Sequence, residues 1–331
     1  MLQATAKSRS VPLSLYEPIH VDLEEVERRL ASCLTSRYES VSLLLGHSLR
    51  LSGKRLRPAL LLLFGKAAGH VNDDHLTLSV SLEMVHTATL VHDDVLDGAE
   101  HRRHKATLNS EFGNTAAILT GDYLFSKAFF LASSLSTPTG AREIGTASSK
   151  VCEGEMRQIG TQGRFDLSLS EYLQIIDAKT AELCRCACKL GCQYAGASEK
   201  EIEAAECYGR NLGTAFQIID DLLDLEGDEA STGKSLGTDF AQSKPTLPWI
   251  HLYQQANEER KSELAAAFQS PQQIERDHLM QWFDESRSIE YSKNVAHQYL
   301  NAALESLEGF ADTAAKRSLI EIAEFTLQRD H

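Results

Sequence analysis

The sequence has little of what a membrane-spanning or nucleic-acid-binding protein needs. Its longest uninterrupted apolar run is six residues, 59–64, whereas a helix needs about 20 to cross a bilayer. Its 33 Lys and Arg residues are outnumbered by 47 Asp and Glu residues, and the formal net charge of −14 argues against a protein that grips nucleic acid phosphates. Only 7 prolines occur, and no segment rich in Pro, Gly or Ser divides the chain. We therefore expect a soluble, cytoplasmic protein that folds as one domain and binds no nucleic acid.

The cysteines form no recognisable metal-binding or disulfide pattern. There are 7, an odd number, and Cys184, Cys188 and Cys192 repeat every four residues, which places them on one face of a helix. A zinc site would need C-x-x-C pairs or sets of Cys and His. We interpret these thiols as small buried residues in a reducing compartment, with a metal or redox role as the alternative.

Apolar residues recur at helical spacing along nearly the whole chain, and no alternating, strand-like segment stands out. Asp22 with Glu25 resembles a capping box that opens the first helix. Further helices are expected at roughly 38–69, 75–96, 105–135, 140–160, 169–196, 198–228, 243–269 and 285–328, the last broken near Gly309. The pattern predicts an all-α domain over residues 21–331 after a flexible tail of residues 1–20. A targeting peptide is the alternative for the tail, although the tail lacks an apolar core.

One acidic motif occurs twice, each time after an apolar helical run. Asp93-Asp94-Val95-Leu96-Asp97 and Asp220-Asp221-Leu222-Leu223-Asp224 share the pattern D-D-x-x-D. On a helix the first and last carboxylates lie about one turn apart, and the middle one lies about 100° around the axis. Two such clusters facing each other would repel unless cations lay between them, and carboxylate oxygens at this density suit magnesium. A solvated helix face would explain either cluster alone, but two copies with apolar flanks favour a metal site.

Basic residues gather in the turns between the expected helices, which suits a polyanionic substrate. The segment 53–58, Gly-Lys-Arg-Leu-Arg-Pro, packs three cations into four positions, and Arg102 with Arg103 follows the first acidic cluster. Three further candidates accompany the second cluster: Lys179, Lys234 and Lys244. Each cation alone could be solvated surface, but the whole set indicates a diphosphate site. The turn 227–246 carries two of these lysines and several glycines, and we expect it to be a mobile lid.

These motifs, with several others, resemble those of the trans (all-E) polyprenyl diphosphate synthases. The further matching segments are 86–97, Phe112-Gly113-Asn114, Gly121-Asp122, Lys179-Thr180, 213–224, 244–248 and 328–330. The resemblance runs from about residue 20 to the end and is strongest to the octaprenyl diphosphate synthase type. It departs at Ser52 and His104, where glycine is common. It implies a single-domain isoprenoid synthase helical bundle around a central cavity, working as a homodimer.

The resemblance also implies a prenyltransferase that adds isopentenyl diphosphate to an allylic diphosphate of the farnesyl or geranylgeranyl type. The allylic diphosphate ionises, the double bond of isopentenyl diphosphate attacks the carbocation, and a proton is then eliminated. About three magnesium ions on the leaving diphosphate would be held by the six aspartates: Asp93, Asp94, Asp97, Asp220, Asp221 and Asp224. The charge of that diphosphate would be shared by Arg102, Lys179, Lys234 and Lys244.

A second, metal-free site would bind isopentenyl diphosphate. The resemblance assigns it to Lys54, Arg57, His86 and Arg103. His86 lies seven residues before Asp93 and hence on the same helical face, although a lone histidine is more commonly a core residue. Thr180 and Gln217 match positions near the reacting carbons, where oxygen dipoles stabilise positive charge. No general base is assigned, because released diphosphate is thought to take the final proton.

Product length is expected to depend on residues before the first acidic cluster. Ala88 and Thr89 lie about 6–8 Å along the helix axis from Asp93, where shorter-chain relatives commonly carry a bulky aromatic. The helix expected over 76–93 is about 27 Å long, which fits a product of about eight isoprene units. Candidates for the floor of the tunnel are Met84, Phe129, Phe130 and Ile144. A shorter, geranylgeranyl-type product is the alternative.

Two other functions are kept as alternatives. A terpene cyclase shares one aspartate-rich motif, but it usually replaces the second with an Asn/Ser/Glu set and has no need of Lys54 or Arg57. A noncatalytic subunit of a heteromeric synthase commonly loses acidic-cluster residues, and this chain keeps all six. The product could supply a respiratory quinone side chain or another lipid. At most transient membrane contact is expected, when the insoluble product leaves.

Overall fold

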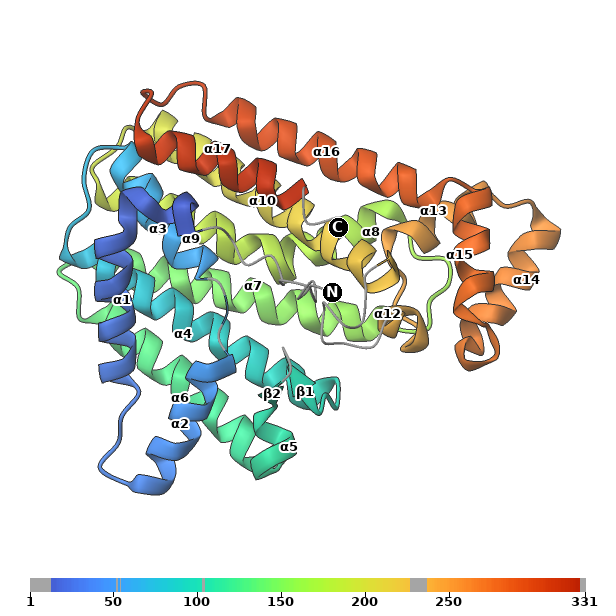
Figure 1. Cartoon of the computed structure of the whole chain (residues 1–331), viewed down its shortest axis with the longest axis horizontal. Helices are drawn as coiled ribbons and strands as arrows, with labels where there is room; N and C mark the ends of the chain where they lie inside the picture. The colour runs from blue at the N-terminus through green and yellow to red at the C-terminus, as the bar shows by residue number, and fades with distance from the viewer. Residues whose placement is uncertain (1–12, 52, 54, 103–104, 227–236, 328–331) are drawn as a thin grey trace, which may run out of the picture.

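Long helices run side by side along the molecule, and shorter ones lie across its two ends (Figure 1). This computed structural model describes residues 13–51, 53, 55–102, 105–226 and 237–327. The first half contains the 3-10 helix η1 (Leu13–Ile19), α1 (His20–Cys33), α2 (Glu39–Leu51), α3 (Leu56–Ala67), α4 (Asp73–Leu96), a hairpin of β1 (His101–Arg102) and β2 (Lys105–Ala106), α5 (Leu108–Phe112), α6 (Asn114–Ser133) and α7 (Thr139–Thr161). The second half contains α8 (Leu169–Ile176), the π-helix η2 (Asp177–Ala181), α9 (Glu182–Tyr194), α10 (Glu199–Glu226), α12 (Thr238–Ala241), α13 (Leu247–Gln255), α14 (Glu258–Gln269), η3 (Pro271–Gln273), α15 (Arg276–Glu285), α16 (Ser288–Ser306) and α17 (Ala314–Leu327). The expected all-α bundle is confirmed.

The centre of the core is formed by α4, α9 and α10. α9 packs between α3 and α10, while α4 packs mainly on α6. Glycine permits the closest approach, since a Cβ on Gly191 of α9 would lie 2.3 Å from the carbonyl oxygen of Leu61 in α3. α4 is buried at nearly every position from Leu78 to Ala88 and becomes partly exposed only towards its C-terminal end. The turns that carry the first acidic cluster are therefore held on a rigid, deeply packed helix.

Four of the expected helical ranges are confirmed to within about two residues at their ends. They are 75–96, found as α4; 140–160, found as α7; 169–196, found as α8, η2 and α9 in succession; and 198–228, found as α10. The break expected near Gly309 lies between α16 and α17. None of the helices in the described ranges is both long and apolar enough to cross a membrane.

The other expected helices are divided where the backbone leaves helical geometry. The range 38–69 is split into α2 and α3, and Arg55 before α3 has a left-handed φ of 54°. The range 105–135 starts with strand β2, where no strand was expected, and is split again at Gly113, whose φ is 85°. The range 243–269 is divided between α13 and α14. Hydrophobic periodicity does not reveal such single positive-φ residues, because the pattern continues on both sides of them.

The chain is already packed before residue 20. Leu15, Tyr16 and Ile19 are buried, and η1 packs on α3 and α17. The flexible tail expected over residues 1–20 therefore does not extend through residues 13–20, and residues 1–12 lie outside the described part of the chain.

The capping box expected from Asp22 and Glu25 is wrong. α1 begins at His20, and the preceding Ile19 makes no side-chain cap hydrogen bond. Asp22 pairs with Lys66 at 2.7 Å, and Glu25 pairs with two arginines of its own helix. Asp22 is the third residue of α1, within its first turn and not at the N-cap position, so the expected pattern does not stand where a capping box forms.

The clustered cysteines are buried in α9. Cys186, Cys188 and Cys192 are inaccessible to solvent, and Cys184 is nearly so. Burial raises the pKa of the Cys188 thiol well above its usual range, which keeps the thiol protonated and unreactive. This placement agrees with the interpretation of these residues as small apolar side chains.

Candidate active site

The first acidic cluster lies at the C-terminal end of α4. Burial raises the pKa of Asp93 to about 6; Lys179 opposes this shift, while Glu155 and Asp97 add to it. Asp97 is more exposed, and its Oδ1 lies 3.1 Å from Nζ of Lys244. Asp93, Asp97 and Glu155 therefore crowd negative charge into one place, where the nearby lysines neutralise it only in part.

Asp94 points away from its two partners in the motif and into the protein. It is 1% exposed, and its Oδ1 accepts hydrogen bonds from Arg102, with both N···O distances at 2.8 Å. Arg102 lies in β1, so this buried ion pair ties the hairpin to the end of α4. In this structure Arg102 neutralises Asp94, and the charge of Arg102 also lowers the pKa of Asp93.

The second acidic cluster lies near the C-terminal end of α10. As in the first cluster, its second aspartate is buried and its first and last aspartates are more exposed. Asp220 is exposed. Asp221 is 7% exposed and accepts hydrogen bonds from Oη of Tyr172 at 2.6 Å and from Nε2 of Gln217 at 2.8 Å. Burial raises the pKa of Asp221, and these two hydrogen bonds counter the shift.

Asp224, the last member of the second cluster, is held by the start of α12. Its Oδ1 accepts from Oγ1 of Thr238 at 2.7 Å, and its Oδ2 accepts from the backbone N–H of Asp239 at 3.0 Å. Its own carbonyl oxygen accepts from the N–H of Gly237 at 2.7 Å. The carboxylate is thus fixed at the point where α10 ends.

Two chains of contacts bring the acidic clusters to the same region of the molecule. In the first, Lys244 reaches Asp97 through its ammonium group, and its backbone N–H donates to the carbonyl oxygen of Asp239, beside Asp224. In the second, Lys179 lies in the field of Asp93 and Asp97, while the adjacent Thr180 donates to Oε1 of Gln217 at 2.7 Å. In the described ranges no three Asp, Glu, His or Cys side chains converge closely enough to hold an ion, and Asp94 and Asp221 are directed elsewhere.

The π-helix η2 presents Lys179 and Thr180 between the clusters. It packs against α7 and α10, where glycines leave room for its backbone: a Cβ on Gly154 would lie 2.6 Å from the N atom of Lys179, and one on Gly213 would lie 2.5 Å from Cα of Ala181. The ammonium of Lys179 pairs with Glu155 of α7 at 2.5 Å. Single π-turns inserted in α-helices commonly occur at functional sites.

The cations of the segment 53–58 have different surroundings. Arg55 pairs with the buried Glu83 at 2.7 Å and also with Glu27, so it belongs to a structural ion-pair network. Arg57 is partly buried, and its Nε has no hydrogen-bond partner among the described residues. A buried guanidinium nitrogen without a partner is costly, so this part of Arg57 differs from Arg55, whose nitrogens are paired.

Three predicted site residues lie outside the described residues: Lys54, Arg103 and Lys234. The same is true of 227–236, the first half of the expected lid, while the second half contains α12. His86 is partly buried on α4, two turns before Asp93.

The residues expected to set product length lie on and beside α4. Ala88 is fully buried, and the partly buried Thr89 donates its hydroxyl to the carbonyl oxygen of His86 at 2.8 Å. Two candidates for the tunnel floor, Met84 and Ile144, are fully buried, and Phe129 is partly buried. Phe130 is 64% exposed, so it is wrong as a floor candidate.

Four residues of this region were not predicted from the sequence: Glu155, Tyr172, Thr238 and Asp239. Thr238 and Asp239 lie inside the turn 227–246, which was expected to be a lid. The neighbouring hydroxyl and carboxylate side chains were the sequence signal that could have marked them as site residues. Glu155 and Tyr172 come from helices far along the chain from the acids they approach, and no local spacing marks them.

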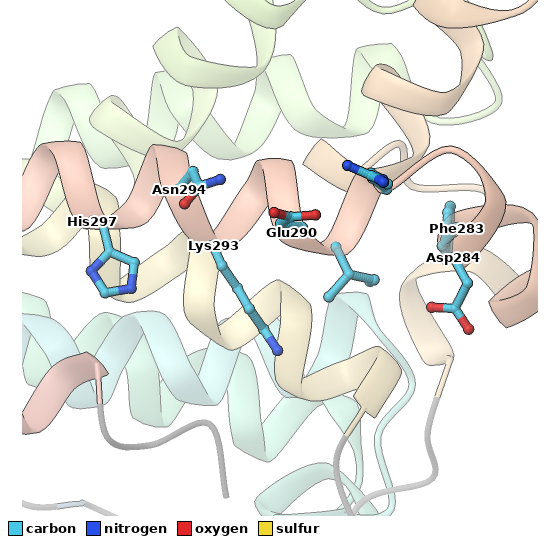
Figure 2. Close-up of a pocket in the computed structure, with 8 residues that line it drawn as sticks. Phe283, Asp284, Glu290, Lys293, Asn294 and His297 are labelled. Carbon is cyan, nitrogen blue, oxygen red and sulfur yellow. The ribbon is translucent and has the colours of Figure 1, made fainter.

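One described pocket lies apart from the acidic clusters, at the junction of α15 and α16. It has a volume of about 440 Å³ and is lined by acids and bases together, including Asp284, Arg287 and Glu290. Lys293 extends from α16 towards α10 (Figure 2), where it pairs with Glu226 at 2.9 Å. Because the lining carries both signs of charge, the pocket does not select an anionic substrate.

Comparison with known proteins identifies the family of this chain from its sequence and from its fold. The sequence model of the polyprenyl synthetase family matches residues 39–285. The chain belongs to the polyprenyl synthetase family. It is 35% identical over 282 residues to the octaprenyl diphosphate synthase of Escherichia coli strain K12, covering 84% of this chain and 86% of that protein. It is 34% identical over 318 residues to heptaprenyl diphosphate synthase component 2 of Geobacillus stearothermophilus, covering 96% and 99%.

A solved structure agrees with this polyprenyl synthetase over almost its whole length. It is the polyprenyl synthase of Caulobacter crescentus CB15 complexed with calcium and isoprenyl diphosphate, with a TM-score of 0.90 and 32% identity, covering 99% of this chain and 100% of that one. The chain is therefore a trans-prenyltransferase with the polyprenyl synthase helical-bundle fold.

Proposed function

We propose that this polyprenyl synthetase condenses isopentenyl diphosphate with an allylic diphosphate of the farnesyl or geranylgeranyl type to make a long all-E polyprenyl diphosphate. The observation that carries the proposal is the joining of the two D-D-x-x-D clusters through Lys244 and α12 on one side and through η2 on the other. The acids that stay partly exposed or exposed in the two clusters, with Lys179 and Lys244 beside them, suit a diphosphate with its counter-ions.

The acids fit magnesium, and the geometry divides them into two groups. Asp93, Asp97, Asp220 and Asp224 are partly exposed or exposed, and the pKa of Asp93 is raised mainly by burial, with Glu155 and Asp97 adding to the shift. Asp94 and Asp221 are buried and position their neighbours. We therefore assign four magnesium ligands, Asp93, Asp97, Asp220 and Asp224, in place of the six that were expected. Bound there, magnesium would neutralise the departing diphosphate.

The chain's own cations do the remaining work on the substrates. We assign Lys179 and Lys244 to the allylic diphosphate, where they would hold it as its C1–O bond breaks and the bonding electrons leave with it. Arg57, with Lys54, His86 and Arg103, is assigned to isopentenyl diphosphate, whose double bond then forms the new C–C bond to C1. Forming this bond leaves a positive charge on the isopentenyl unit. The carbon next to that charge then loses a proton, which the released diphosphate takes.

We further propose a product of about eight isoprene units, because α4 is about 30 Å long up to the cluster and carries small residues just before it. Ala88 has no bulk to obstruct a growing chain. A geranylgeranyl-type product is the alternative, and it requires a large side chain to obstruct the path within the first turns before Asp93.

One assay tests both catalysis and length. The purified chain is incubated with farnesyl diphosphate, labelled isopentenyl diphosphate and magnesium, and the dephosphorylated product is sized. Long-chain product from the chain alone would exclude a noncatalytic subunit, the alternative raised by the likeness to a heptaprenyl synthase component. Cyclic hydrocarbon would instead indicate a terpene cyclase, whereas no product without a partner chain would contradict the proposal.

The different surroundings of Arg55 and Arg57 predict different losses for substitutions at two positions that are only two residues apart. Arg57→Ala should raise the KM for isopentenyl diphosphate at least about tenfold, with little change for the allylic substrate, because one charge-assisted contact is lost. Arg55→Ala should instead lower the free energy of unfolding by about 3 kcal/mol, because Glu83 would be left buried and unpaired. Equal rises in both KM values for Arg57→Ala would contradict the two-site assignment.

We propose that the chain is a homodimer through the outer faces of α6 and α7. Large apolar side chains are exposed on both helices, which pack against each other: Ile118, Leu119, Tyr123, Phe130, Met156 and Ile159. Leu119 is 62% exposed, which is unusual for a leucine unless a partner covers it.

A charge placed in this face should therefore separate the subunits. Leu119→Glu is expected to convert a dimer to a monomer in light scattering, because the carboxylate would be buried without a partner. Val21→Glu is the matched control, since Val21 of α1 is also exposed, at 63%, and α1 packs on α3, α4 and η1 instead of on α6 or α7. A dimer that survives Leu119→Glu would place the interface elsewhere.

A further inference from the structure

Tyr172, Asp221, Gln217 and Thr180 form a continuous chain of hydrogen bonds that ends next to Lys179. Tyr172 donates to Oδ2 of Asp221, Gln217 donates to Oδ1 of Asp221, and Thr180 donates to Oε1 of Gln217, at 2.6, 2.8 and 2.7 Å. We propose that Tyr172 is a positioning residue that acts through Asp221, and that it fixes Gln217 and Thr180 so that they present oxygen lone pairs to the allylic carbon. This inference rests on the proposed function.

The direction of each hydrogen bond follows from the carboxylate of Asp221, which accepts from both sides. Both carboxylate oxygens of Asp221 accept, so Gln217 must turn its NH₂ group to Asp221 and its Oε1 to Thr180. The Thr180 hydroxyl has one proton, and it gives this proton to Oε1. The lone pairs of the Thr180 oxygen, and one of Oε1, receive no other hydrogen bond from the described residues.

The arrangement is rigid because its anchor is buried. Tyr172 is 4% exposed and Asp221 7%. Asp221 and Gln217 lie one turn apart on α10, while Tyr172 lies on α8, which continues directly into η2 and Thr180. The hydroxyl of Tyr172 therefore ties α8 to α10 and stops the Asp221 carboxylate from rotating away from the Gln217 amide.

This orientation matters for the rate and little for binding. Positive charge develops at C1 only as the C–O bond breaks, with the electron pair leaving on diphosphate. Fixed oxygen dipoles stabilise that charge, whereas N–H or O–H groups in the same place would destabilise it. Loss of the orientation should therefore lower kcat and leave the substrate KM values nearly unchanged.

Tyr172→Phe tests the role, since it removes the hydroxyl and keeps the ring. We expect kcat to fall on the order of tenfold, the loss of one hydrogen bond to a charged group, with both KM values within about twofold. Tyr208→Phe is the matched control, because Tyr208 is also fully buried and donates at 2.6 Å, to the carbonyl oxygen of Leu319 away from the acids. It should lose similar thermal stability and keep its kcat.

A double substitution separates positioning from a general structural effect. If Tyr172 acts through Gln217, then Tyr172→Phe should cause no further loss of kcat in a Gln217→Ala background. A full additional tenfold loss there, an unchanged kcat in Tyr172→Phe, or an equal loss in Tyr208→Phe would each overturn the inference. An inactive wild-type chain would refute the proposed function itself, whereas these three results would refute only the role of Tyr172.

Discussion

Asp93→Asn is expected to lower magnesium-dependent condensation at least ~10²-fold while making the fold more stable. The loss of activity follows because Asp93 is the most crowded of the acids assigned to the leaving diphosphate, with Lys179, Glu155 and Asp97 all acting on it. The gain in stability follows because the same crowding and burial make the ionised carboxylate unfavourable in the folded protein. A residue retained for chemistry at the expense of stability should show both effects together.

The stability gain should depend on pH in a definite direction. The folded pKa of Asp93, about 6, lies above the ordinary 3.8, so the folded state holds this proton more tightly than the unfolded state. Ionisation between about pH 4 and pH 6 therefore lowers the free energy of unfolding of the native chain, and the penalty is complete above pH 6. Asp93→Asn avoids it, with a gain of at most ~3 kcal/mol at neutral pH that disappears below about pH 4.

Thermal melts with and without magnesium, alongside product assays, would check this result. Magnesium should raise the melting temperature of the native chain and do so much less in Asp93→Asn, because a ligand stabilises only the state that binds it. Asp74→Asn is the matched control, with the same substitution at the opposite end of α4. Retained activity, or an identical magnesium response in both variants, would contradict the assignment of Asp93.

Ala88→Phe is expected to shorten the product from about eight isoprene units to about three or four, since Ala88 lies only ~7.5 Å along α4 from Asp93. A phenyl ring at this depth would block the path of the chain after the first condensations. The effect would be large because the growing product cannot bypass a side chain held on a buried helix.

Reversed-phase sizing of the products would measure the change in chain length. A thermal melt of the same variant would show whether the methyl group of Ala88 faces unfilled space or packed atoms. If its methyl group faces unfilled space, phenylalanine should cost less than about 1 kcal/mol of stability. If it faces packed atoms, overpacking should cost about 1–3 kcal/mol. Ala88→Ser is the control and should leave product length unchanged; an unchanged length for Ala88→Phe would place the tunnel on another face of α4.

The helices that carry the acids could be predicted because their pattern is local. The ranges of α4 and α10 follow from apolar periodicity, and the spacing within each D-D-x-x-D motif already separates its middle carboxylate from the outer two. What the spacing leaves open is where that middle carboxylate goes. The partners of Asp94 and Asp221 lie on a hairpin and on α8, and such pairings depend on tertiary packing.

Cations were harder to assign than acids for the same reason. Arg55 and Arg57 are two residues apart in one basic segment, yet Arg55 pairs with Glu83, whereas Nε of Arg57 has no hydrogen-bond partner in the described part of the chain. Arg55 has a left-handed φ of 54° just before α3, whereas Arg57 lies within α3, so their side chains do not follow one helical arrangement. Composition and spacing contain no information on that single torsion angle.

The π-helix has a consequence for how this family member could lose its activity. A π-turn contains one residue more than the α-helical turn it replaces, so every residue after it is rotated by about 100° relative to a regular helix. Deletion of a single residue within 177–181 would let α8 and α9 join as one uninterrupted α-helix. If the cysteine face of α9 stayed buried, Lys179 and Thr180 would rotate away from their partners Glu155 and Gln217. We therefore expect the loss of one codon here to abolish activity while leaving the surrounding helices folded.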